Sequence, residues 1–316
     1  MRPAMKNSNT PGQSTFALKE SGCEASFLHG GPYWHLCTPG HSTELLCESE
    51  DDYRFFVTAS AIAAAETGVR IITFQIMSNH LHYILEAADS HCRLFFDSLR
   101  RRIHRRLASV RDFVDLSAFV HKLIPIEDLP AMRSEIAYVN RNGYLADSRY
   151  TPFSYPWGAG YLYYNPAAAY DAAIPFRDMT TRATLQLCRS RIPVLPEAYL
   201  VGNQMILPQS FCAVKRGESF FRDAHHYFAA VSKNHEAYSE IAKRLGDDVF
   251  LSDDEMFATL TMICRKNYNE SRATMLPVRD KLELARQMRR DYNASEGQIQ
   301  RMLRLDRSVV AELFGR

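Results

Sequence analysis

The chain lacks the features that would place it in a membrane or in an export pathway. It contains no apolar run of about 18 residues, the length that a membrane-spanning helix needs. Residues 1–15 are polar and carry no apolar segment of the kind found in secretory signal peptides. We therefore expect no membrane association.

Clustered cysteines and an excess of one charge are also missing. The seven cysteines are scattered and none forms a CxxC pair, which favours free thiols in the cytoplasm over disulfides or a structural zinc site. The formal net charge is only +2, too small to indicate a nucleic-acid partner by itself. Any basic surface must therefore be local.

Strand and helix patterns alternate over the first half of the 316 residues. Residues 32–38 alternate apolar and polar side chains, and two apolar runs at 69–76 and 80–87 are separated by a Ser-Asn break that predicts a hairpin. Helical periodicity covers residues 50–67, about 91–111 and about 126–142. We expect an α+β fold in which helices pack on an antiparallel sheet.

The length predicts more than one domain. We expect a disordered lead-in at 1–28, an α+β domain at 29–170 and a mainly α-helical C-terminal region at 171–316. An irregular aromatic segment at 150–170 separates the last two. Helical stripes are expected to bury Phe96, Leu99, Ile103, Leu107 and Val110 in one helix and Leu129, Met132, Ile136 and Val139 in the next, which Gly143 would end.

Residues 278–315 are a helix-turn-helix candidate. Ser295 and Gln298 have the spacing of a capping box, Asp306 can cap a second short helix, and Gly315 can end it. A helical hairpin with a purely structural role has the same pattern.

Two histidines, His80 and His82, flank Leu81 at the start of a strand pattern. Successive side chains of a strand alternate between faces, so both imidazoles point the same way, about 6–7 Å apart, and can converge on one cation. The alternative is that both are ordinary polar-face histidines of a half-buried strand.

A tyrosine and an asparagine share one face of a later helix. Tyr138 and Asn142 are four residues apart, and Tyr138 lies off the apolar stripe of its helix, beside Arg141. A helical tyrosine that packs in the core with a satisfied hydroxyl is the alternative. Tyr144 and Tyr150 are rival tyrosines nearby.

The order of NHLHYIL (79–85), YVNRN (138–142) and SYPWG (154–158) resembles the single-tyrosine HUH transposases of bacterial insertion sequences, in particular the REP-associated tyrosine transposases. The resemblance covers about residues 30–165. It departs after Asn142, where the family tends to have Pro-Val-Arg and this chain has Gly-Tyr-Leu.

This resemblance implies a ferredoxin-like or RRM-like HUH endonuclease domain that cleaves and rejoins single-stranded DNA through a 5′-phosphotyrosine. It implies that His80, His82 and Asn142 hold Mg²⁺ or Mn²⁺ and that Tyr138 is the nucleophile. Single-stranded or hairpin DNA would be the partner of a monomer or homodimer.

Basic side chains supply candidate DNA contacts. Five arginines lie on the expected exposed sides of the helix after the histidine strand, almost free of nearby acids, although a solvated charge run has the same appearance. Arg141 lies beside Tyr138 and Asn142, and the last helix begins near residue 307. The candidate DNA-binding residues are Arg100, Arg101, Arg102, Arg105, Arg106, Arg141, Arg307 and Ser308.

Two other functions remain open from the sequence. A metal hydrolase of a small substrate would use the two histidines with further His or Asp ligands. A DNA-binding regulator on an inactive transposase scaffold would act through the C-terminal helices.

Overall fold

A computed structural model of the protein describes residues 11–40, 45–112, 116–117, 119–146, 149–151, 153–169, 173–189, 195–233, 241–242, 244–245, 251, 253–270 and 272–314. These residues form two compact units. The first comprises the described parts of Met1–Tyr144 and Arg149–Asn234, and the second those of Leu145–Ser148 and His235–Arg316. The predicted boundary at residue 170 therefore lies within the first unit.

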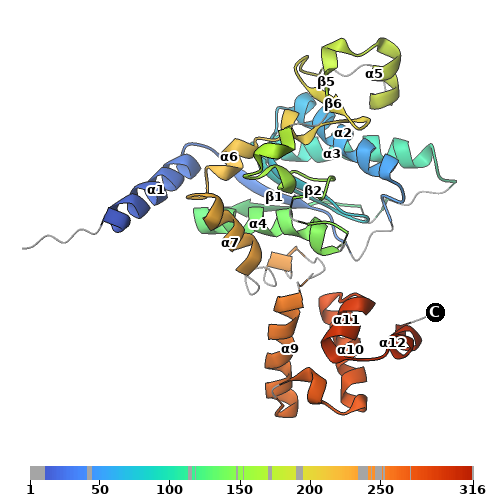
Figure 1. The fold of residues 1–316 in the computed structure, drawn as a ribbon. Helices are drawn as coiled ribbons and strands as arrows, with labels where there is room; N and C mark the ends of the chain where they lie inside the picture. Colours follow the sequence, from blue (N-terminus) through green and yellow to red (C-terminus); the bar gives the residue numbers. More distant parts are fainter. Residues whose placement is uncertain are drawn as a thin grey trace, which may run out of the picture. The chain divides into compact units, whose positions relative to one another are not determined.

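One four-stranded antiparallel sheet organises the first unit (Figure 1). Its strands are β1 (Tyr33–Cys37), β2 (Arg70–Ile76), β3 (Leu81–Glu86) and β4 (Lys122–Ile126). They lie in the order β2-β3-β1-β4, and every neighbouring pair is antiparallel. The predicted α+β class, the first strand and the β2–β3 hairpin are confirmed, whereas β4 was not predicted.

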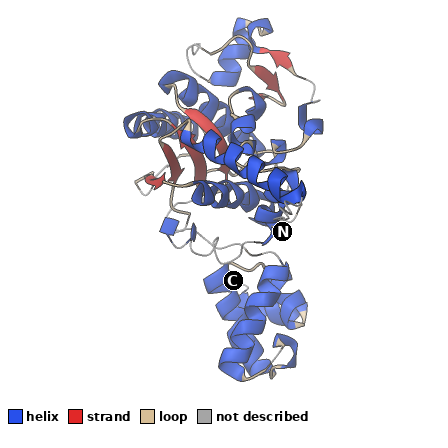
Figure 2. Ribbon diagram, turned by 90° about the vertical axis from the view of Figure 1, so that its left-hand side faces the viewer, coloured by secondary structure: helices blue, strands red, loops and turns tan. Residues whose placement is uncertain are grey.

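Helices cover both faces of this sheet (Figure 2). On one face lie α2 (Glu50–Thr67) and α3 (Asp89–Ala108): the Tyr83 hydroxyl is 2.7 Å from Ser60 of α2, and its ring packs on α3. On the other face lies α4 (Leu129–Ala146), whose Glu135 is bonded to His35 of β1. The sheet therefore separates α4 from the α2–α3 pair.

Capping residues and glycines set the ends of these helices. Ser49 and Asp52 form a complete capping box at the start of α2, and Gly68 ends that helix at φ 68°. Gly143 does not end α4, as its sequence position suggests, because the helix continues to residue 146. A Cβ at Gly143 would lie 2.5 Å from Cδ1 of Tyr155, so glycine is needed there for close packing.

The predicted apolar stripes of α3 and α4 are buried with one exception. Val110 is 52% exposed because α3 ends at residue 108, before the stripe reaches it. The other eight stripe residues are buried: Phe96, Leu99, Ile103, Leu107, Leu129, Met132, Ile136 and Val139.

The aromatic segment between residues 150 and 170 completes the edge of β2. Trp157 accepts a hydrogen bond from Ile76 N (2.9 Å), and Ala159 donates to Phe74 O (3.0 Å). The Tyr155 hydroxyl donates to Ile76 O (2.7 Å). The segment thus supplies main-chain partners to an edge strand, and its buried aromatic rings belong to the core.

The N-terminal helix differs from the prediction of a disordered lead-in. Residues 11–28 form α1 (Pro11–Leu28), while residues 1–10 lie outside the described part of the chain. Glu20 pairs with Arg133 and Arg222, and Cys23 is 4% exposed. These contacts with distant residues supply the order that the local sequence does not predict.

Short elements complete the first unit. A small sheet of β5 (Ile174–Pro175), β6 (Leu200–Gly202) and β7 (Met205–Ile206) was not predicted, and Ile206 N donates to Thr58 of α2 (3.2 Å). The remaining α-helices of the unit are α5 (Thr181–Cys188), α6 (Val214–Glu218) and α7 (Ala224–Lys233). The 3₁₀ turns are η1 (Gly160–Leu162), η2 (Pro166–Ala169), η3 (Phe176–Asp178) and η4 (Pro208–Ser210).

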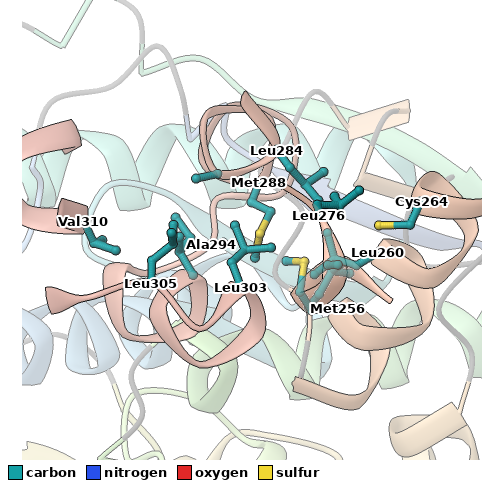
Figure 3. Packing of buried hydrophobic residues seen from close by; sticks show 14 residues of the cluster. Met256, Leu260, Cys264, Leu276, Leu284, Met288, Ala294, Leu303, Leu305 and Val310 are labelled. Carbon is teal, nitrogen blue, oxygen red and sulfur yellow. The ribbon is translucent and has the colours of Figure 1, made fainter. Parts of the chain in front are cut away.

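The second unit is helical and has its own hydrophobic core (Figure 3). It contains α9 (Asp253–Tyr268), η5 (Ala273–Met275), α10 (Val278–Tyr292), α11 (Glu296–Leu303) and α12 (Arg307–Phe314). Leu284, Met288 and Leu303 are fully buried in this core.

Local sequence signals predict part of this unit. Ser295 caps α11 by accepting from Gln298 N (3.2 Å). The Gln298 side chain donates to Leu251 O (2.9 Å) and to Asp253 instead of completing a capping box. The predicted stop at Gly315 lies outside the described residues. Among the helices that the structure describes, none is both long and apolar enough to cross a membrane.

Candidate active site

The two histidines of the HxH motif lie on the sheet face that α4 covers. His82 stands directly opposite Cys37 of β1 and Gln75 of β2, so their side chains share this face. The ring centroids of His80 and His82 are 4.9 Å apart, and the rings are nearly perpendicular. Both side chains are almost completely buried.

The tyrosine of α4 reaches the same cluster. The Tyr138 ring lies 5.6 Å from that of His82, measured between centroids. Asn142 is buried one helical turn beyond Tyr138, and its Nδ2 makes no hydrogen bond with the described residues. The structure therefore brings His80, His82 and Tyr138 together and places Asn142 on the next turn of the same helix.

Two further residues of the cluster were not recognised from the sequence. His35 of β1 lies with its Nε2 3.1 Å from Nδ1 of His82. Its Nδ1 lies 2.7 Å from the Glu135 carboxylate. His35 and Glu135 are 0% and 1% exposed as side chains, so Glu135, His35 and His82 form a buried hydrogen-bond chain. The signal for it was a histidine in a strand otherwise suited to the core.

The hydrogen bonds from Glu135 to His35 and from His35 to His82 determine which ring nitrogens carry a proton. The Glu135 carboxylate only accepts, so Nδ1 of His35 carries a proton. In neutral His35 the Nε2 atom then accepts, and the proton of His82 sits on Nδ1. With His35 neutral, the lone pair of His82 is on Nε2, the ring nitrogen that faces away from His35.

A second contact fixes His80 in the same way. The Asn79 amide nitrogen donates to Gly40 O (2.6 Å), which orients the amide. The Asn79 Oδ1 atom is then 2.8 Å from His80 Nδ1 and accepts its proton. His80, like His82, therefore has its lone pair on Nε2.

These contacts fit a site for a divalent cation. Metal-binding histidines donate their second ring N–H to a neighbouring acceptor, as both imidazoles do here. Within the described ranges, no three His, Cys, Asp or Glu side chains are grouped to hold a metal ion. A cation here would thus have two imidazole ligands and take oxygen ligands from Asn142 and from a substrate, a set compatible with Mn²⁺ or Mg²⁺.

Helix α4 is oriented over the sheet by a second buried network. The Thr73 hydroxyl of β2 bonds to Asn140 Oδ1 (2.5 Å), and Asn140 Nδ2 donates to the Tyr227 hydroxyl (2.9 Å). Asn140 lies two residues after Tyr138 on α4. This network fixes the height and rotation of the helix that presents the tyrosine.

The predicted DNA-binding arginines of α3 are not equally exposed. Arg101 and Arg105 are exposed, whereas Arg100 and Arg102 are half-buried. Arg106 is 8% exposed and pairs with Asp52, so its expected exposed position is wrong. The whole helix also lies on the sheet face opposite Tyr138.

The other predicted contact residues lie in different surroundings. Arg141 of α4 is 3% exposed, so it belongs to the interior. Arg307 and Ser308 are exposed at the start of α12. Of the rival tyrosines, Tyr144 is half-buried on α4, and Tyr150 packs against Tyr155.

Comparisons with known proteins do not assign the chain to a family. No protein-family model matches its sequence, and no curated protein matches it. The function is therefore inferred from the side chains described above and from the motifs that they carry.

Proposed function

We propose that this chain is a transposase-like endonuclease of the HUH type, which cleaves and rejoins single-stranded or hairpin DNA. Tyr138 would be the nucleophile, and His80, His82 and Asn142 would hold Mg²⁺ or Mn²⁺. The observation that carries the proposal is the contact of the Tyr138 ring with His82, whose ring in turn lies 4.9 Å from that of His80, measured between centroids.

The topology supports the same function. The order of elements β1-α2-β2-β3-α3-β4, with the strands arranged β2-β3-β1-β4, is the split βαβ connectivity of ferredoxin-like domains. The motif resemblance implies this connectivity. In this connectivity the HxH motif lies at the start of an inner strand, β3, and the tyrosine lies on α4, the helix that follows the fourth strand.

The chemistry proposed for Tyr138 is a reversible transesterification. A bond forms between its phenolic oxygen and phosphorus as the bond from phosphorus to the 3′ oxygen breaks; the phenol loses its proton, and the 3′ oxygen gains one. When bound, the cation would polarise the scissile phosphate. Because Tyr138 is 3% exposed, DNA reaches it only when the side chains that cover it move apart.

An adduct assay tests this function. Wild-type protein is incubated with hairpin-bearing single-stranded DNA and Mn²⁺, and a covalent protein–DNA adduct is sought on a denaturing gel. We expect Tyr138→Phe to abolish the adduct and Tyr144→Phe and Tyr150→Phe to retain it. An adduct that survives in Tyr138→Phe would assign the nucleophile to another residue.

A DNA-binding regulator is the second candidate, and the burial of Tyr138 and both histidines favours it. A regulator needs no access to these side chains and would bind through the exposed start of α12. DNA binding without cleavage in either Mg²⁺ or Mn²⁺, lost on replacement of Arg307, would support the regulator over the nuclease.

A further inference from the structure

A cavity lined by arginines lies on the opposite side of the sheet from Tyr138. It has a volume of about 250 Å³ and is formed where the last turn of α3 meets the end of α5. Four guanidinium groups line it, from Arg102, Arg105, Arg106 and Arg189. The first three belong to the arginine run of α3, whereas Arg189 was not a predicted binding residue.

The carboxylates around this cavity neutralise only two of the four arginines. Arg106 pairs with Asp52 (3.2 Å), and Arg102 pairs with Glu66. Asp52 is also shared with the start of α2, where its other oxygen accepts from Ser49. Arg105 and Arg189 have no carboxylate partner in the described part of the chain. Asp51 and Asp52 act on the charge of Arg189 without forming an ion pair with it in the described residues, so the lining keeps an excess of positive charge.

Arg189 is exposed, and its backbone conformation is unusual. It ends α5 in the left-handed region at φ 45°, which non-glycine residues seldom adopt. Partial burial and the nearby Arg106 charge lower the pKa of Arg189, and the charges of Asp51 and Asp52 only partly offset this. Like charges held close together in this way are stabilised by an anion between them.

We propose that this cavity binds a phosphate group. Guanidinium forks match the tetrahedral oxygens of phosphate, and a phosphate carries negative charge that complements the excess positive charge of the lining. At about 250 Å³, the cavity is smaller than the pockets of roughly 300–1,000 Å³ that enclose drug-sized ligands. It therefore takes a phosphate with little of the molecule attached to it.

The phosphate has two chemical sources, a DNA strand or a free phosphorylated small molecule. The first source rests on the proposed function. Because the sheet lies between this cavity and Tyr138, a DNA phosphate held here is not the one that is cleaved. The cavity would instead anchor a distant part of the same substrate.

Two variants remove the unpaired charges without disturbing the fold. Arg189→Asn keeps a residue that tolerates the left-handed conformation, and Arg105→Gln changes an exposed position. Arg182→Ala is the matched control, because Arg182 is exposed on α5 and does not line the cavity. Circular dichroism verifies that all three variants are folded.

Binding of inorganic phosphate is measured by isothermal titration calorimetry at constant ionic strength, with chloride as the reference anion. We expect wild type and Arg182→Ala to bind phosphate, and Arg189→Asn and Arg105→Gln to bind it about tenfold more weakly. Equal phosphate binding by all four proteins, or none by wild type, would overturn the proposal.

Fluorescence anisotropy with a single-stranded oligonucleotide identifies the source. If the cavity holds a DNA phosphate, Arg189→Asn reduces the slope of log association constant against log salt concentration by about one. Inorganic phosphate then also competes with the oligonucleotide. Phosphate binding without such competition assigns the cavity to a free phosphorylated molecule. Tyr138→Phe should bind phosphate normally, so failure of the nuclease proposal is distinguishable from failure of this one.

Discussion

Replacing Glu135 tests whether the buried chain sets the proton position on His82. Glu135→Leu removes the carboxylate that accepts from His35 Nδ1. His35 can then carry its proton on Nε2 and donate to His82 Nδ1, which moves the His82 proton to its own Nε2. That atom is the one that would bind the cation, so we expect weaker Mn²⁺ binding.

The expected magnitude follows from the burial of the chain. Loss of an outer partner of a metal-binding histidine typically weakens metal affinity 10- to 100-fold, or about 1.4–2.7 kcal/mol. His35 and Glu135 are 0% and 1% exposed, so water does not replace the lost acceptor. We therefore expect Glu135→Leu to weaken Mn²⁺ binding about 100-fold. Glu135→Gln, which keeps a neutral acceptor, should weaken it about tenfold.

Two measurements check this expectation. Calorimetry gives the Mn²⁺ affinity, and ¹⁵N chemical shifts of the His82 ring in the metal-free protein report its tautomer. Glu127→Gln, an exposed carboxylate, is the control for charge alone. Wild-type Mn²⁺ affinity together with an unchanged His82 tautomer in Glu135→Leu would refute the reasoning.

Three other changes have defined outcomes. Gly143→Ala should lower the free energy of unfolding by about 1–3 kcal/mol in urea, because its Cβ clashes with packed side chains; Gly22→Ala, which meets nothing within 4 Å, should not. Leu303→Ala should lower the free energy of unfolding of the second unit by about 2–5 kcal/mol, measured as faster amide exchange in α11. The hydrogen bond from Arg133 lowers the pKa of Glu20. The ionised Glu20 therefore stabilises the docking of α1 at a pH above 4.5, the ordinary pKa of a glutamate. This stabilisation is lost as the pH falls through the lowered pKa, and amide exchange of α1 measures the loss.

Sequence patterns predict the elements whose signals are local. The helix expected over 50–67 is α2, and its ends depend only on nearby residues, Ser49 and Gly68. The spacing of the HxH pair and of Tyr138 with Asn142 places each pair on one face of its element, and the resemblance to HUH transposases singles them out as a candidate site. Periodicity also predicts the stripes of α3 and α4 nearly in full.

Elements that depend on distant partners are missed. The strand β4 contains Pro125 and lies beside only one neighbour in the sheet, so its sequence lacks a strong strand signal. His35 gains its role from the strand register, which sets it two residues from the partner of His82. Glu135 joins the site only when α4 docks on the sheet. No local pattern contains this information.

The contacts of α1 impose a delay between the synthesis of this helix and its docking. Lys19 and Glu20 pair with Asp223 and Arg222, which lie 204 and 202 positions later in the chain. At translation rates of about 5–20 residues per second, the ribosome makes these partners roughly 10–40 s after α1. Docking of α1 is thus a late event of co-translational folding.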